Sequence, residues 1–465
     1  MNVSETSRRP LALGAAALTG VVLWSWPAAM AATPRHALAI GAFMIVSWAT
    51  QALDPAVTGL IGCYLFWALH VVAFPIAFGG FADSSTWFIF AAMLIGEMVA
   101  VTPLPRRLAF GILQLTGATY ARVLAGVILA DLALTFFVPS GVARVVVLAP
   151  VAIGLVEAFG LGAGSRVGRG LFVAMIYAST IFDKMILGGA AAITAKSAME
   201  QTGHVQVLWS RWAIACAPAL LLTVVITWWL TLRLFPPEIA ELPGGRAFLR
   251  DSFRAMGSWS RTEKRVAALL LLALGLWSTD FWHHLSPAIV GIGVGLAAFL
   301  PGIGALDGQD LRRTNLTPVI FVGCAISMGN VLSSAGALAD ATAALAHGVA
   351  PLVHGLGTGS VVLYLSACVY HLLIGNEIAM IATSMPAMMH IAQDRGLDPF
   401  AVGVIWTLGS GGKLFLYQST VLIVGHAYGY FDRRDLLKIG AWLTLAEAVV
   451  VLALSAVYWP LIGLG

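Results

Sequence analysis

The chain has 465 residues, of which 59% are hydrophobic and only 10% are charged. Soluble domains carry roughly 25% charged residues, so this composition excludes the soluble class. The net charge of +4 is spread over loops and does not indicate a nucleic-acid surface, and the four cysteines lack the paired spacing of a disulfide framework or a zinc site.

The N-terminal stretch 8–34, RRPLALGAAALTGVVLWSWPAAMAATP, has a basic start, an apolar middle and an A-x-A-like end. These features are typical of a secretory signal. The apolar part is long, however, and many further apolar segments follow it. We therefore expect residues 1–34 to form an uncleaved N-terminal helix rather than a removed signal.

Apolar runs of about 18 or more residues, the length that crosses a ~30 Å hydrocarbon core, recur along the chain. They predict an all-α polytopic membrane protein of about 11 transmembrane helices. Several runs are too short to span, or are broken by Gly, Pro or charge. Irregular backbone at membrane depth is tolerated only against protein or a water-filled cavity, so we expect these pieces to form re-entrant hairpins that line a cavity.

The first half, 35–232, contains a hairpin near 123–160 with the break PSGVAR (139–144). Ser140, Gly141 and Val142 would form its tip, where backbone N–H groups and a positive helix end suit an anion. Arg144 follows directly, and a charge in a membrane segment is a functional hypothesis by default. Two interpretations are open: Arg144 binds a carboxylate of the substrate, or it pairs with Asp131 and only ties helices together.

Asp183 and Lys184 lie further along the first half, between YASTIF and MILGG. The linker 233–265 then carries seven Arg/Lys residues against four acidic ones. The positive-inside rule places this linker in the cytoplasm.

The second half, 266–465, contains a hairpin near 350–392 whose tip is Gly375-Asn376-Glu377. Pro386 follows Asn376 by ten residues, as Pro150 follows Ser140. GGKLFL (411–416) matches FDKMIL (182–187), so that Lys413 corresponds to Lys184. Paired, interrupted segments of this kind predict two inverted-topology repeats with the site at their interface.

For several polar residues the sequence leaves both a structural role and a role in transport open. A Lys184–Asp183 or Lys413–Glu377 ion pair would lower the cost of burying each charge, and direct roles in transport are equally open. Gln418, Ser419 and Thr420 could contact a polar substrate or a neighbouring helix. The carboxylates of Glu97 and Glu447 are expected to be helix–helix contacts.

Motifs for other functions are absent from the sequence. There is no G-x-x-x-x-G-K-[ST] loop, H-E-x-x-H or G-x-S-x-G motif, so we expect neither an ATP-driven pump nor an enzyme. Two rivals remain: a cation or proton antiporter in which Glu377 and Asp183 titrate, and a membrane enzyme or sensor that transports nothing.

Three stretches resemble the divalent anion:sodium symporter family, within it the 2-oxoglutarate/malate translocator branch. PPEIAELP (236–243) and MGSWSRTEKR (256–265) are similar to the family's linker, and STVLIVGHAYGYFDRRDLLKIG (419–440) is similar to its late segment. PSGVAR resembles the family's P-S-N-T-A-R. The resemblance covers nearly the whole chain and implies an elevator-like homodimer.

The resemblance also implies a site. The family's two Ser-Asn-Thr tips bind substrate carboxylates and help form two sodium sites. Here the tips read Ser140-Gly141-Val142 and Asn376-Glu377-Ile378, so both central asparagines and both threonines are replaced. We therefore expect sodium coupling not to be carried over intact. The two matching lysines, Lys184 and Lys413, lie in the segments that would face the two tips. Our hypothesis is that they supply the positive charge of the sodium ions.

These observations predict a secondary active transporter of small organic anions, of the di- or tricarboxylate type. It would work as a symporter or antiporter in the inner (plasma) membrane, and the altered sodium-site motifs favour sodium-independent exchange. The expected partners are the anion, the lipid bilayer and a second copy of the chain. No metal or other cofactor is expected, and Na⁺ is the one ion left open.

Overall fold

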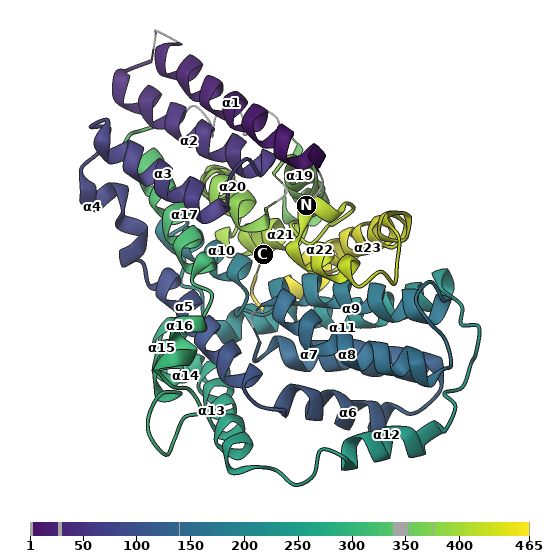
Figure 1. The fold of residues 1–465 in the computed structure, drawn as a ribbon. Helices are drawn as coiled ribbons and strands as arrows, with labels where there is room; N and C mark the ends of the chain where they lie inside the picture. Colours follow the sequence, from purple (N-terminus) through teal and green to yellow (C-terminus); the bar gives the residue numbers. More distant parts are fainter. Residues whose placement is uncertain are drawn as a thin grey trace.

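In a computed structural model of the protein, residues 3–26, 30–138, 140–337, 352–353, 355–374 and 376–464 are described. Every regular element within these ranges is a helix (Figure 1), which confirms the predicted all-α membrane class. The helices of the first half are α1 (Val3–Ser25), α2 (Ala32–Thr50), α3 (Pro55–Ala68), α4 (Phe74–Ala77), η1 (Gly79–Ala82), α5 (Ser84–Ala100), α6 (Leu104–Thr116), α7 (Tyr120–Thr135), α8 (Gly141–Ala158), α9 (Arg166–Met185), α10 (Ala190–Gln201) and α11 (Trp209–Leu234).

The linker and the second half contain the remaining helices. They are α12 (Gly245–Arg254), α13 (Arg261–Ser278), α14 (Asp280–His283), α15 (Pro287–Ala297), α16 (Gly308–Arg313), α17 (Thr317–Ser334), α19 (Leu356–Leu373), α20 (Glu377–Asp394), α21 (Pro399–Gly409), η3 (Leu416–Gln418), α22 (Thr420–Ala427), α23 (Arg433–Ala453), η4 (Leu454–Tyr458) and α24 (Trp459–Leu461).

The N-terminal helix α1 lies along α2 at one end of the molecule (Figure 1). The rings of Trp24 and His36 stack with centroids 3.7 Å apart, which fixes the two helices together at that end. Gly20 lets the backbone of α1 approach α2, since a Cβ there would lie 3.3 Å from the carbonyl oxygen of Ala39.

The linker is anchored to the helical body by Arg107 of α6. Its Nε donates to Glu263 Oε1 at 2.8 Å, and its two Nη atoms donate to the carbonyls of Gly257 and Met256. Both side chains of the ion pair are nearly fully buried. The helix α12 packs against α6 beside this anchor (Figure 1).

A second linker residue, Glu238, holds the start of α9. Its carboxylate accepts hydrogen bonds from the backbone N–H groups of Arg166 and Val167, at 2.5 and 3.1 Å. Partial burial of Glu238 opposes its ionisation, but these N–H donors and the Arg166 guanidinium hold its pKa below the usual range.

The order helix, tip, helix, broken helix occurs twice. In the first half α7 and α8 form a hairpin, and α9 is followed by a break at 186–189 and by α10. In the second half α19 and α20 form a hairpin, and α21 is followed by a break, η3 and α22. The inverted orientation of the two repeats, and the domain boundaries drawn from it, stay predictions.

Six helical segments of the described ranges are long and apolar enough to cross a membrane, and α5 with α6, bent by 71°, make a seventh if taken as one span. Shorter apolar helices lie at Arg9–Ser25, Pro55–Ala68, Pro287–Ala297 and Pro399–Gly409. The predicted count of about 11 spans therefore stays a prediction.

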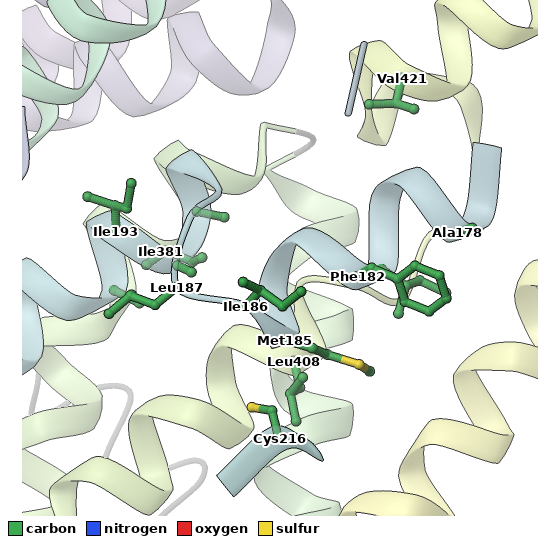
Figure 2. Close-up of a cluster of buried hydrophobic side chains, with 14 of the residues drawn as sticks. Ala178, Phe182, Met185, Ile186, Leu187, Ile193, Cys216, Ile381, Leu408 and Val421 are labelled. Carbon is green, nitrogen blue, oxygen red and sulfur yellow. The ribbon is translucent and has the colours of Figure 1, made fainter. Parts of the chain in front are cut away.

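The break between α9 and α10 is packed in an apolar cluster. Figure 2 shows Met185 and Ile186 at this break beside Leu408 of α21 and Cys216 of α11, with Phe182 earlier in α9. All five side chains are buried. Apolar side chains from several helices thus enclose the break, and the charged residues Asp183 and Lys184 lie at its edge.

Candidate functional site

One cavity of about 350 Å³ brings the two tips and the late polar stretch together. Its lining contains nine of the residues that the sequence predicted for the site: Ser140, Gly141, Val142, Asp183, Asn376, Glu377, Gln418, Ser419 and Thr420. Gly375, also predicted to belong to the second tip, lies outside the described residues, as does Pro139 of the first. Further lining residues come from α5, from the end of α2 and from residues 314–318.

The first tip is the N-terminus of α8. Ser140 is the N-cap, and its Oγ accepts a hydrogen bond from the N–H of Ala143 at 3.3 Å. Gly141 follows because the tip lies directly against α9: a Cβ on Gly141 would be 2.7 Å from the carbonyl oxygen of Ser179 and 2.9 Å from Val421. An asparagine at this position would therefore require the tip to move.

The second tip is the N-terminus of α20. Asn376 is the N-cap, and its Oδ1 accepts hydrogen bonds from the N–H groups of Ile378 and Ala379, both at 3.0 Å. The carboxylate of Glu377, the first residue of α20, lines the cavity. A carboxylate in the first turn also suits the positive end of the helix dipole.

A third helix N-terminus, that of α22, reaches the same cavity. Ser419 is its N-cap, and its Oγ accepts a hydrogen bond from Val421 N–H at 3.2 Å. Thr420 is exposed towards the cavity. The fully buried Gln418 holds its own segment instead, since its Oε1 accepts from the N–H groups of Leu414 and Phe415 at 2.7 and 2.9 Å.

Three helix N-termini thus line one cavity, those of α8, α20 and α22. The first-turn N–H groups of a helix have no intrahelical acceptor, and each N-terminus carries the equivalent of roughly +0.5 charge. Convergence of such ends is suited to a carboxylate, sulfate or phosphate group. The arrangement is therefore suited to a small polyvalent anion.

Behind the cavity, Glu377 connects the two lysines. Its Oε2 lies 2.8 Å from Lys184 Nζ and 2.7 Å from Lys413 Nζ. Lys184 Nζ also lies 3.1 Å from Asp183 Oδ1 and donates to the carbonyl of Thr180. Both ion pairs considered from the sequence are present, with a Lys184–Glu377 pair that the sequence did not indicate.

The two lysines occupy equivalent positions in their segments, but they do not lie at separate tips. Each is about 1% exposed and lies at the break of a membrane segment, Lys184 at the end of α9 and Lys413 after α21. Sequence symmetry suggested one lysine facing each tip. Instead, both meet at the second tip, because the carboxylate that neutralises them belongs to Glu377.

Arg144 does not line the cavity. Its side chain is fully buried, with Nε 3.4 Å from Asp131 Oδ1 and its Nη atoms donating to the carbonyls of Val138 and Ser179. Ser179 Oγ donates to the same carboxylate. Of the two interpretations left open by the sequence, the structure shows the pairing with Asp131. The prediction that Arg144 binds the anion is therefore wrong. The guanidinium N–H groups of Arg144 instead fix the first tip to α9.

Glu97 of α5 lines the cavity, although the sequence indicated a helix–helix contact. It is half-buried, and among the described residues it forms no ion pair. Its charge inside an apolar helix was the signal that could have found it. Gln51, at the end of α2, was missed altogether: it lines the cavity and its Nε2 lies 3.4 Å from the carbonyl of Tyr417.

Residues 6–464 match the family model described as "Sodium:sulfate symporter transmembrane region". The chain belongs to this family. The match spans both tips, both lysines and the linker, which confirms the resemblance drawn from the linker and late segment. Membership makes the chain a multi-pass inner-membrane protein of a transporter family.

Individual relatives align over most of their length. A "Membrane protein" of Cupriavidus necator is 28% identical over 473 residues, covering 96% of this chain and 91% of the relative. The "Citrate/succinate antiporter" of Escherichia coli strain K12 is 23% identical, covering 83% and 80%. "Dicarboxylate transporter 1, chloroplastic" of Spinacia oleracea is 24% identical, covering 97% and 81%.

Proposed function

We propose that the protein is a secondary transporter that exchanges small di- or tricarboxylates across the membrane without sodium. The observation that carries the proposal is the cavity itself, where three helix N-termini converge beside a carboxylate held by two buried lysines. The named relatives, an antiporter of citrate and succinate and a dicarboxylate transporter, support the substrate class.

The lysines are the reason for proposing independence from sodium. A buried ammonium group is a fixed positive charge, and the two ammonium groups lie at the breaks of two membrane segments, next to the altered tip at Glu377. A bound cation would have to compete with Lys184 and Lys413 for the same carboxylate oxygen. No sodium ion is then needed to neutralise the interior.

We further propose that transport involves no chemical conversion and follows an elevator-like movement in a homodimer. Support comes from the lining of the cavity, which joins the tips and broken segments to α5 and to residues 314–318. Movement of the tips and broken segments relative to α5 and residues 314–318 would carry the anion across.

A cation or proton antiporter is the second candidate, since Asp183 and Glu377 both line the cavity. It makes a different prediction. An antiporter of this kind would move protons or cations in the complete absence of an organic anion, whereas the exchanger requires an anion on both sides.

The test is exchange by purified protein in sodium-free, potassium-containing liposomes. Labelled succinate is offered outside, with succinate, sulfate or no anion inside. We expect uptake only with internal succinate. Uptake with empty liposomes, or proton flux without any dicarboxylate, would contradict the exchanger and favour the second candidate.

A further inference from the structure

Glu377 occupies the place that a substrate carboxylate would compete for. Its Oε2 accepts from both Lys184 Nζ, at 2.8 Å, and Lys413 Nζ, at 2.7 Å. The side chain lines the cavity and is 21% exposed, whereas the lysines are buried and absent from the lining. A protein carboxylate therefore covers the pair of ammonium groups on the cavity side.

The four charges that these ion pairs join cancel. Lys184 and Lys413 carry two positive charges, and Glu377 with Asp183, 3.1 Å from Lys184 Nζ, carry two negative ones. Glu97, which also lines the cavity, adds a negative charge, half-buried and without an ion-pair partner in the described ranges. An entering anion thus meets helix N-termini, not uncompensated ammonium groups.

We propose that Glu377 determines which substrate charge the cavity accepts. Because it neutralises the ammonium pair, the cavity holds dianions and disfavours trianions. This inference rests on the proposed function and narrows its substrate class from di- or tricarboxylates to dicarboxylates. The cavity volume of about 350 Å³ does not exclude a small tricarboxylate, so the discrimination is by charge.

The experiment is a charge series in the full-length protein. Glu377→Gln raises the charge of the cluster by one unit, Lys413→Gln lowers it by one, and the double variant restores the wild-type value. Dissociation constants for succinate and for tricarballylate are measured by calorimetry at about pH 8, where every carboxyl group of both compounds is ionised. The control variant is Glu157→Gln. It also removes one negative charge, but from an exposed side chain near the end of α8, away from the cavity.

The expected readout is the ratio of the two dissociation constants, succinate over tricarballylate. Unit charges about 6 Å apart at an effective dielectric constant of about 20 change an equilibrium constant by roughly 100-fold, and water in the open cavity weakens this effect. We expect the ratio to rise by about tenfold in Glu377→Gln, to fall in Lys413→Gln, and to stay near wild type in the double variant and in Glu157→Gln.

Each outcome decides. A ratio that follows the cluster charge supports the inference. A ratio that stays constant across the series, in variants that bind both compounds, overturns it and leaves the proposed function standing. A wild-type protein that binds neither compound overturns both. If Glu377→Gln does not fold, the two remaining variants provide the test. A ratio of dissociation constants that falls in Lys413→Gln and returns to the wild-type value in the double variant supports the inference. A ratio that stays at the wild-type value in both variants overturns it.

Discussion

Replacing Arg144 tests whether this residue is structural. Arg144→Met leaves the fully buried Asp131 carboxylate without its counter-charge, and breaking one side of a buried ion pair costs about 3–5 kcal/mol. In Asp131→Asn/Arg144→Met no charge remains. The carbonyls of Val138 and Ser179 still lose their donor, at a cost of about 1–3 kcal/mol for each unsatisfied buried group.

We therefore expect the double variant to be more stable than Arg144→Met, despite carrying one more substitution. The free energy of unfolding is measured by SDS titration in mixed micelles. Succinate affinity is measured on the same samples, and we expect the folded double variant to bind within about threefold of wild type, since Arg144 does not line the cavity. A folded double variant whose succinate affinity falls by a factor of about 100, roughly 2.7 kcal/mol, would refute the structural role and restore anion binding to Arg144.

Three further substitutions test the tips and the wall. Gly141→Ala places a Cβ 2.7 Å from the carbonyl oxygen of Ser179, so overpacking should cost about 1–3 kcal/mol in SDS unfolding. Gly154→Ala in the same helix meets nothing within 4 Å and should instead stabilise it by up to about 1 kcal/mol; equal effects would contradict the close approach. Asn376→Ala removes the cap of α20 and should cost about 1 kcal/mol and weaken succinate binding, whereas unchanged affinity would show that this helix end does not contribute. Glu97→Gln removes a negative charge from the cavity wall and should tighten succinate binding about threefold, and weaker binding would instead indicate that Glu97 assists the substrate.

The positions of the tips were predictable from local sequence. Pro-Ser-Gly and Gly-Asn interrupt apolar runs where Ser140 and Asn376 can act as N-caps, and these residues begin α8 and α20 in the structure. The ten-residue spacing to a proline placed the second tip in register with the first. Helix starts depend on a few neighbouring residues, which is why the sequence alone located them.

The partners of the charges were not predictable in the same way. Glu377 meets Lys184 across 193 positions of sequence, and no local pattern encodes that contact. Symmetry between the halves suggested one lysine for each tip and missed their common partner. Glu97 was misjudged for a related reason: whether a carboxylate on a helix faces a cavity depends on which helices pack around it.

The sodium dependence of exchange tests most directly whether the two buried lysines replace sodium. Succinate exchange is measured in liposomes with sodium or with potassium as the only cation, for wild type, Lys184→Met and Lys413→Met. We expect equal wild-type rates in both salts and a strong loss of exchange in either lysine variant. Wild-type exchange that rises steeply with sodium and is unchanged in both variants would contradict it.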